Sequence, residues 1–231
     1  MSAAPKRENI FEAYFSKLSK IILPLFIKTK LTPNQVTIIS GIFGVIGSFL
    51  ILYGDFYLNI VSGVFIQIFA ILDLVDGDIA RHKKMQSNRG MWLDIFFDKT
   101  NDFIIIICFT IGAFLVNPSP IVLFIGMCLM GVNFYIQFIM ILNNFYFKEN
   151  RSSNKNLIDK ATRSKRKIIG FIGSIIFFYR EHVSLQHSQF LVLVSFFLIV
   201  NKLELGLYII TIHGALSLVI SILTNFIKIK N

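Results

Sequence analysis

Six long apolar segments constrain the fold of this chain more than any other feature of its sequence. They cover about residues 34–53, 57–80, 90–116, 119–146, 183–200 and 204–227. Crossing a hydrocarbon layer of roughly 30 Å takes about 20 apolar helical residues, and a helix satisfies all of its own backbone polar groups there. We therefore predict an all-α, polytopic integral membrane protein whose six transmembrane helices form a core of about residues 34–227.

The composition excludes an ordinary soluble domain. Hydrophobic residues make up 55% of the 231 residues and charged residues only 16%, with a mean hydropathy of +0.68. Soluble domains contain roughly a quarter charged residues. We interpret residues 1–231 as a single membrane domain.

Basic residues are distributed very unevenly along the chain. The formal net charge is +10, and 21 of the 23 Lys and Arg residues fall in residues 1–33, 81–89, 147–182 and 228–231. Positive charge collects on the cytosolic side of membrane proteins and attracts anionic lipid headgroups. This pattern predicts that both termini are cytosolic, that the partners include membrane lipids, and that nucleic acid is not a partner.

The segment before the first span reads as an amphipathic helix over about residues 8–29. Ile10, Tyr14 and Leu18 recur at helical spacing, whereas Lys17 occupies another side. Such a helix lies in the membrane interface, although a helix packed on the domain is the alternative. After it, Thr32 is the expected N-cap of the first span, and Pro33 is the expected first helical residue.

Six of the thirteen carboxylates lie between Leu72 and Asp102, inside the second and third spans. Acidic groups at membrane depth are costly and usually functional. Asp73 and Asp76 are three residues apart, and Asp94, Asp98 and Asp102 are each four apart, so each set shares one helix face. The short polar connection 82–89 makes the two helices antiparallel neighbours, so the two sets should face each other near the cytosolic end.

Four facing carboxylates repel one another unless a cation lies between them. Oxygen ligands favour Mg²⁺, Mn²⁺ or Ca²⁺ over Zn²⁺, and two such ions would suit phosphoryl transfer. Gly77 and Gly90 flank the acidic positions. They could open the helices to a ligand, or they could serve close helix packing. Asp102 is expected only to support the stripe, and Asp78 to be incidental.

The pattern of acids and glycines resembles the signature of a known family, the CDP-alcohol phosphatidyltransferases. The matching run is Asp73-x2-Asp76-Gly77-x2-Ala80-Arg81-x8-Gly90-x3-Asp94-x3-Asp98. The resemblance implies transfer of a phospho-alcohol from a CDP-alcohol donor to an acceptor hydroxyl, with release of CMP. It also implies Mg²⁺ or Mn²⁺, two ions per site, and a homodimer.

The resemblance implies roles for individual residues as well. Asp98 would be the general base. The metal ligands would be Asp73, Asp76, Asp94 and Asp98. The nucleotide pocket would be lined by Gly77, Ala80, Arg81 and Gly90, together with a short element that resembles one of the family, Pro33, Asn34 and Thr37. For that last element, simple helix capping is the alternative.

The substrates are less well indicated. The residues around the motif resemble the branch of di-myo-inositol phosphate phosphate synthase and phosphatidylinositol phosphate synthase, which implies an inositol phosphate acceptor. The donor would be CDP-inositol or, alternatively, the lipid CDP-diacylglycerol or CDP-archaeol of a phospholipid synthase. Arg180 and the basic residues of 163–167 are candidates for binding a phosphorylated acceptor at the cytosolic face, or else for anchoring to headgroups. His187 is expected to be structural or exposed.

Two other functions fit parts of the pattern. Intramembrane carboxylates also form ion pathways in transporters. However, the acids are confined to one hairpin, and the later spans carry only Glu204 near the outer edge. A non-catalytic scaffold is disfavoured because every acidic motif position is intact.

Overall fold

The computed structural model describes residues 10–150 and 187–229, and all regular structure in these two ranges is helical. The helices are α1 (Ile10–Ile27), α2 (Pro33–Leu50), the short 3₁₀ helix η1 (Ile51–Tyr53), α3 (Phe56–His82), α4 (Asn88–Val116), α5 (Pro120–Asn150), α8 (His187–Ile199) and α9 (Leu203–Ile229). The prediction of an all-α membrane protein is confirmed, and the predicted spans differ from these helices by a few residues at their ends.

Five of the helices are long and apolar enough to cross a membrane: α2 with η1, α3, α4, α5 and α9. The sixth predicted span corresponds to α8, a shorter apolar helix of 13 residues. The first residues predicted for that span, 183–186, lie outside the described ranges.

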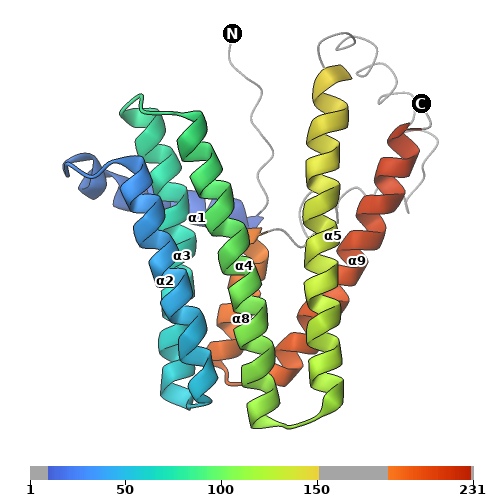
Figure 1. Cartoon of the computed structure of the whole chain (residues 1–231). Helices are drawn as coiled ribbons and strands as arrows, with labels where there is room; N and C mark the ends of the chain where they lie inside the picture. Colours follow the sequence, from blue (N-terminus) through green and yellow to red (C-terminus); the bar gives the residue numbers. More distant parts are fainter. Residues whose placement is uncertain (1–9, 151–186, 230–231) are drawn as a thin grey trace.

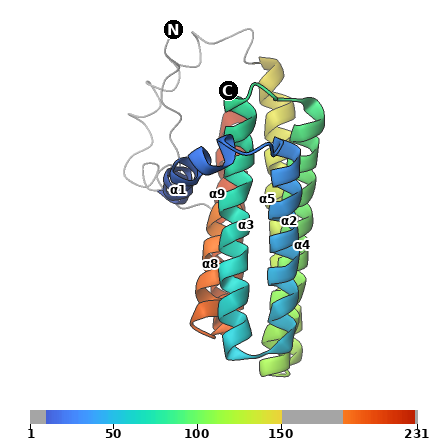
Figure 2. The same cartoon turned by 90° about the vertical axis from the view of Figure 1, so that its left-hand side faces the viewer.

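Helices α2, α3 and α4 form one side of the bundle, and α5 pairs with α9 on the other (Figure 1). Helix α8 packs against α3, and α1 lies across the bundle rather than along it (Figure 2). Phe15 of α1 is buried in the core at 1% exposure, whereas Ile21 and Leu25 remain 72% and 68% exposed. Helix α1 therefore packs on the domain with one face and presents an apolar surface outward with another, and its place in the membrane interface stays a prediction.

Small residues on α2 let α3 and α4 each approach α2 closely. A Cβ placed on Gly41 would lie 2.3 Å from Cδ1 of Phe97, and one on Gly44 would lie 2.2 Å from Oδ1 of Asn101. On the side facing α3, a Cβ on Gly47 would lie 3.0 Å from the Cβ of Phe65. Close approach at small residues is the usual way in which membrane helices pack. Helix α2 thereby holds the two acid-bearing helices together.

Caps and turns fix the helix ends at the level of the acidic stretch. Thr32 is the N-cap of α2, as predicted, and it forms a capping box with Gln35. Lys83 at the end of α3 donates to the carbonyl oxygens of Thr29 and Leu31 at 3.0 and 2.9 Å. The loop between α1 and α2 is therefore tied to the end of α3.

Candidate active site

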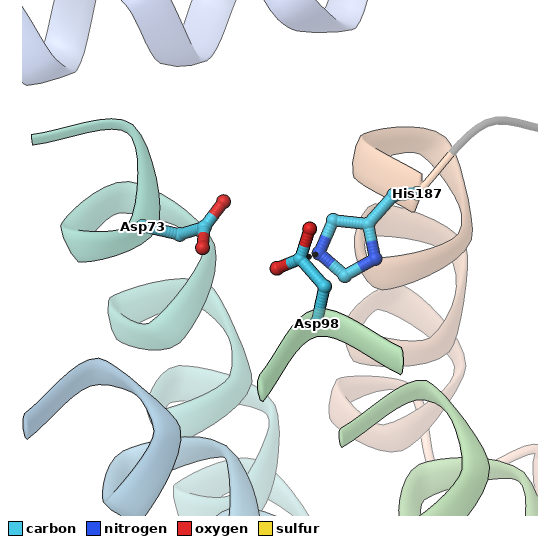
Figure 3. A group of neighbouring side chains, drawn as sticks. All are labelled: Asp73, Asp98 and His187. Carbon is cyan, nitrogen blue, oxygen red and sulfur yellow. Dashed lines mark ion pairs between the residues drawn. The ribbon is translucent and has the colours of Figure 1, made fainter. Parts of the chain in front are cut away.

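The four predicted carboxylates converge between α3 and α4. One oxygen from each of Asp73, Asp76 and Asp94 lies within 4.8 Å of the others. Asp73 also belongs to a second group, in which one ligand atom from each of Asp73, Asp98 and His187 lies within the same 4.8 Å (Figure 3). The expectation that the two acidic faces meet is confirmed, and Asp73 lies where the two groups overlap.

His187 was missed as a site residue by sequence reasoning. It is the first residue of α8, and its Nε2 lies 3.6 Å from Oδ1 of Asp98. Its Nδ1 lies 2.8 Å from Oδ1 of Asp102. The only signal in the sequence was an ionisable side chain at the edge of an apolar segment, which is typical of functional positions in membranes. Nothing in the spacing along the chain indicated that α8 would enter the acidic cluster.

Asp102, one helical turn after Asp98 on α4, supports the cluster, as expected. Its side chain is only 3% exposed, and it contacts His187 on α8. It also accepts a hydrogen bond from Nε2 of Gln137 at 3.5 Å, and Nζ of Lys99 lies 3.8 Å from it. A buried carboxylate needs such partners, so Asp102 is fixed by α5 and α8 together with its own helix.

The start of α2 touches both acid-bearing helices. The buried hydroxyl of Thr37 donates a hydrogen bond to Oδ2 of Asp76 on α3. A Cβ placed on Gly90 of α4 would lie 3.0 Å from Oδ1 of Asn34. Pro33, the first residue of α2, is buried. Because Thr32 makes the cap, the side chains of Asn34 and Thr37 are available to the cluster.

Gly77, Ala80 and Arg81 lie on α3 beyond the carboxylates, and the first two are half-buried. A Cβ on Gly77 would meet nothing closer than the guanidinium of Arg81, at 3.6 Å, so this glycine does not serve helix packing among the described residues. The side chain of Arg81 is 62% exposed, and its Nη2 lies 2.6 Å from Oδ1 of Asp78.

Asp78 is not incidental, and that prediction was wrong. It accepts a hydrogen bond from the hydroxyl of Ser19, a fully buried residue of α1, at 2.5 Å. Its other oxygen pairs with Arg81. Asp78 lies off the face shared by Asp73 and Asp76, and the crossing helix α1 provides its partner on that other face.

Several residues predicted for the acceptor lie outside the described ranges. They are Arg180 and the basic residues of 163–167.

The sequence profile of the CDP-alcohol phosphatidyltransferase family matches residues 30–203, about three quarters of the chain. The chain belongs to this family. The match includes all of α2, the acidic motif on α3 and α4, and His187 on α8. Enzymes of this family use a CDP-alcohol donor and a hydroxyl acceptor.

Two similar proteins narrow the branch within the family. The bifunctional IPC transferase and DIPP synthase of Aquifex aeolicus (strain VF5) is 33% identical over 87 residues, which are 38% of this chain and 19% of that protein. The archaetidylinositol phosphate synthase of Pyrococcus horikoshii is 27% identical over 153 residues, which are 63% of this chain and 70% of that protein. The chain thus spans about a fifth of the Aquifex relative, and both relatives belong to the branch that the sequence predicted.

The residues of this site fit a divalent metal. Oδ1 of Asp98 and Nε2 of His187 are buried and have no hydrogen-bond partner among the described residues, although buried polar atoms are almost always paired. Both atoms belong to a group of potential ligands, and the neighbouring carboxylates would repel one another without a cation. The donor set and its unpaired atoms are therefore what a metal site requires.

The arrangement disfavours ion transport. Helices α8 and α9 contain a single carboxylate, Glu204, which accepts hydrogen bonds from Asn117 at 2.8 Å and from Tyr208 at 2.9 Å. These residues lie at the opposite end of α4 from the acidic cluster. The described residues thus provide no chain of acidic groups across the bundle.

Proposed function

We propose that the chain transfers a phospho-alcohol group from a CDP-alcohol to an acceptor hydroxyl in a reaction that depends on a divalent metal and releases CMP. The observation that carries this proposal is the convergence of the motif carboxylates into two ligand groups that share Asp73. Mg²⁺ or Mn²⁺, with two ions per site, is the proposed cofactor. When bound, the ions would neutralise diphosphate oxygens and stabilise the charge that develops during transfer.

The proposed ligands of the metals are Asp73, Asp76, Asp94 and Asp98. Thr37 supports this assignment because its hydroxyl orients Asp76. For the donor nucleotide we propose a surface formed by Gly77, Ala80, Arg81 and Gly90, with Pro33, Asn34 and Thr37 beside it. The space over Gly77 and the contact of Gly90 with Asn34 support this surface.

Asp98 is the proposed general base. As the acceptor oxygen forms its bond to the phosphorus of the phospho-alcohol, the bond between that phosphorus and the CMP oxygen breaks. Asp98 takes the proton of the acceptor hydroxyl, and CMP leaves with the electron pair of the broken bond. The position of Asp98 supports this role, because it faces Asp73 and does not bond to any described donor through Oδ1.

The proposed acceptor is an inositol phosphate. The name of the Pyrococcus relative contains this group, and the Aquifex relative is named in part as a DIPP synthase. CDP-inositol is the first donor that we propose. A lipid CDP-alcohol is the second candidate, because the relative aligned over 70% of its length is named for an archaetidyl product.

The site is proposed to face the cytosol, with both termini on the same side. The distribution of Lys and Arg residues supports this orientation, since residues 81–89, which join α3 to α4 next to the site, contain four of them. A homodimer is proposed from the family resemblance. Cross-linking of the protein in native membranes would test it.

The decisive experiment is a CMP-release assay with purified protein and Mg²⁺ or Mn²⁺. CDP-inositol, CDP-diacylglycerol and CDP-archaeol should each be combined with inositol phosphate, glycerol phosphate, serine and inositol. We expect release with inositol phosphate and at least one donor. Release from none of the pairs, by protein that is folded and binds metal, would reject the proposed reaction.

Asp98→Asn tests the base within the same assay. It should abolish turnover but retain part of the metal binding, because the group of Asp73, Asp76 and Asp94 stays intact. Asp55→Asn is the matched control at the opposite end of α3. Asp55 caps that helix, and asparagine caps equally well. A near-normal rate for Asp98→Asn would show that another group takes the proton.

A further inference from the structure

The two ligand groups of the site differ in chemistry. The group of Asp73, Asp76 and Asp94 offers only oxygen atoms. The other group adds the imidazole of His187 to the carboxylates of Asp73 and Asp98. An imidazole nitrogen favours transition metals over Mg²⁺, whereas an all-oxygen site binds both kinds of ion. The metal preference of the second group therefore depends on whether His187 binds the ion.

The contact with Asp102 orients the imidazole. Nδ1 of His187 lies 2.8 Å from Oδ1 of Asp102, a carboxylate that is itself held by Gln137. A neutral imidazole has one N–H, and a carboxylate accepts it. In the neutral imidazole this contact assigns the proton to Nδ1 and leaves the lone pair of Nε2 to face the carboxylates. Metal-binding histidines commonly donate their other ring N–H to a carboxylate in this way.

The second ring nitrogen of His187, Nε2, is buried and has no hydrogen-bond partner among the described residues. Oδ1 of Asp98, 3.6 Å away, has no hydrogen-bond partner among them either. Figure 3 shows the imidazole from α8 and the carboxylates of Asp73 and Asp98 converging from three helices. Two ligands about 2.1 Å from one ion lie at most about 4.2 Å apart. A small rotation of Asp73 or Asp98 brings a group spanning up to 4.8 Å into that range.

We infer that His187 is a direct metal ligand through Nε2, with Asp73 and Asp98, and that Asp102 is the residue that positions it. This inference rests on the metal dependence in the proposed function and makes the two positions unequal. The all-oxygen position suits Mg²⁺ or Mn²⁺ alike. The mixed position prefers a transition metal, so of the two proposed ions it favours Mn²⁺ over Mg²⁺.

The test is spectroscopic and needs no substrate. Purified protein carrying about one Mn²⁺ per chain is examined by electron spin echo envelope modulation, once with natural-abundance and once with ¹⁵N-labelled histidine. We expect a ¹⁴N modulation that changes to the ¹⁵N pattern on labelling. His187→Gln should abolish it and His82→Gln should retain it, because His82 is an exposed residue at the end of α3.

Calorimetry supplies the second measurement. Asp102→Asn should weaken Mn²⁺ binding by about 10- to 100-fold, because removing a carboxylate that orients a metal-binding histidine typically has that effect. His187→Gln should weaken binding of Mn²⁺ more than binding of Mg²⁺. An equal loss for the two ions would contradict the mixed site.

Wild-type protein with bound Mn²⁺ and no histidine nitrogen coupling would overturn the inference, and His187 would then only pair with Asp98 and Asp102. This outcome does not depend on whether any variant folds. It is also separate from the proposed reaction. Nitrogen coupling in a protein that releases no CMP would support the metal site and reject the reaction. CMP release without nitrogen coupling would support the reaction and reject His187 as a ligand.

Discussion

The hydroxyl of Thr37 donates a hydrogen bond to the carboxylate of Asp76. It is the one described hydrogen bond that joins α2 to a motif carboxylate, and both residues are buried, with 3% and 4% exposure. An oxygen that must bind a metal in one geometry needs a fixed carboxylate, and a buried hydroxyl supplies a donor that water cannot replace.

We expect Thr37→Val to loosen Asp76 while preserving the shape of the side chain. The buried carboxylate loses its donor, so the free energy of unfolding should fall by about 1–3 kcal/mol and Mn²⁺ affinity should drop. Thermal unfolding in detergent, with and without Mn²⁺, measures both effects. Thr37→Ser retains the hydroxyl and should behave like the natural protein. If both variants bind Mn²⁺ normally, the hydrogen bond has no part in the site.

Asp73 should be the most sensitive of the metal ligands, because it belongs to both ligand groups. Saturating metal at about 100 times its Kd stabilises a protein by roughly 2.7 kcal/mol. We expect Asp73→Asn to lose nearly all of the increase in melting temperature that Mn²⁺ gives. Asp76→Asn should lose only part of it, because the group of Asp73, Asp98 and His187 stays intact. Equal losses in the two variants would argue against a shared ligand.

Gly77→Ala separates ligand binding from helix packing. Its Cβ would have only an ordinary contact with Arg81, and alanine is favoured over glycine in helices by about 1 kcal/mol. We therefore expect stability that is unchanged or slightly increased, together with a raised KM for the CDP-alcohol. Gly44→Ala is the contrasting control, because its Cβ would overlap Asn101 and should destabilise the fold. Normal kinetics for Gly77→Ala would place the nucleotide elsewhere.

Asp78→Asn should act through Arg81. Loss of the 2.6 Å ion pair frees the guanidinium, and we expect the KM for the donor to rise several-fold with a smaller change in kcat. Ser19→Ala removes only the hydrogen bond from α1 and should lower stability while leaving the pair with Arg81 in place. A comparison of KM for the two variants is therefore the measurement. An unchanged KM in Asp78→Asn with a raised KM in Ser19→Ala would show that Asp78 serves only to hold α1 in place.

Much of the fold is local in origin and was therefore predictable. The long apolar segments require helices in a membrane, and Thr32 with Pro33 marks where α2 begins. The spacing of the acids predicted that Asp73 and Asp76 would meet Asp94 and Asp98, because a short connection makes the two helices run antiparallel. The structure adds that α3 and α4 are brought together mainly by packing on α2. All of these predictions concern residues on one helix or on two helices joined by a short loop.

Contacts between distant segments were not predictable in this way. His187 is 85 residues from Asp102 in the chain, and Ser19 is 59 residues from Asp78. Helical spacing determines which face a residue occupies, but not which other helix covers that face. The sequence by itself thus determined the membrane helices, the acidic hairpin and the family. Only the tertiary structure decided that α8 brings an imidazole to the carboxylates and that α1 fastens Asp78, because packing between segments far apart in the chain sets those contacts.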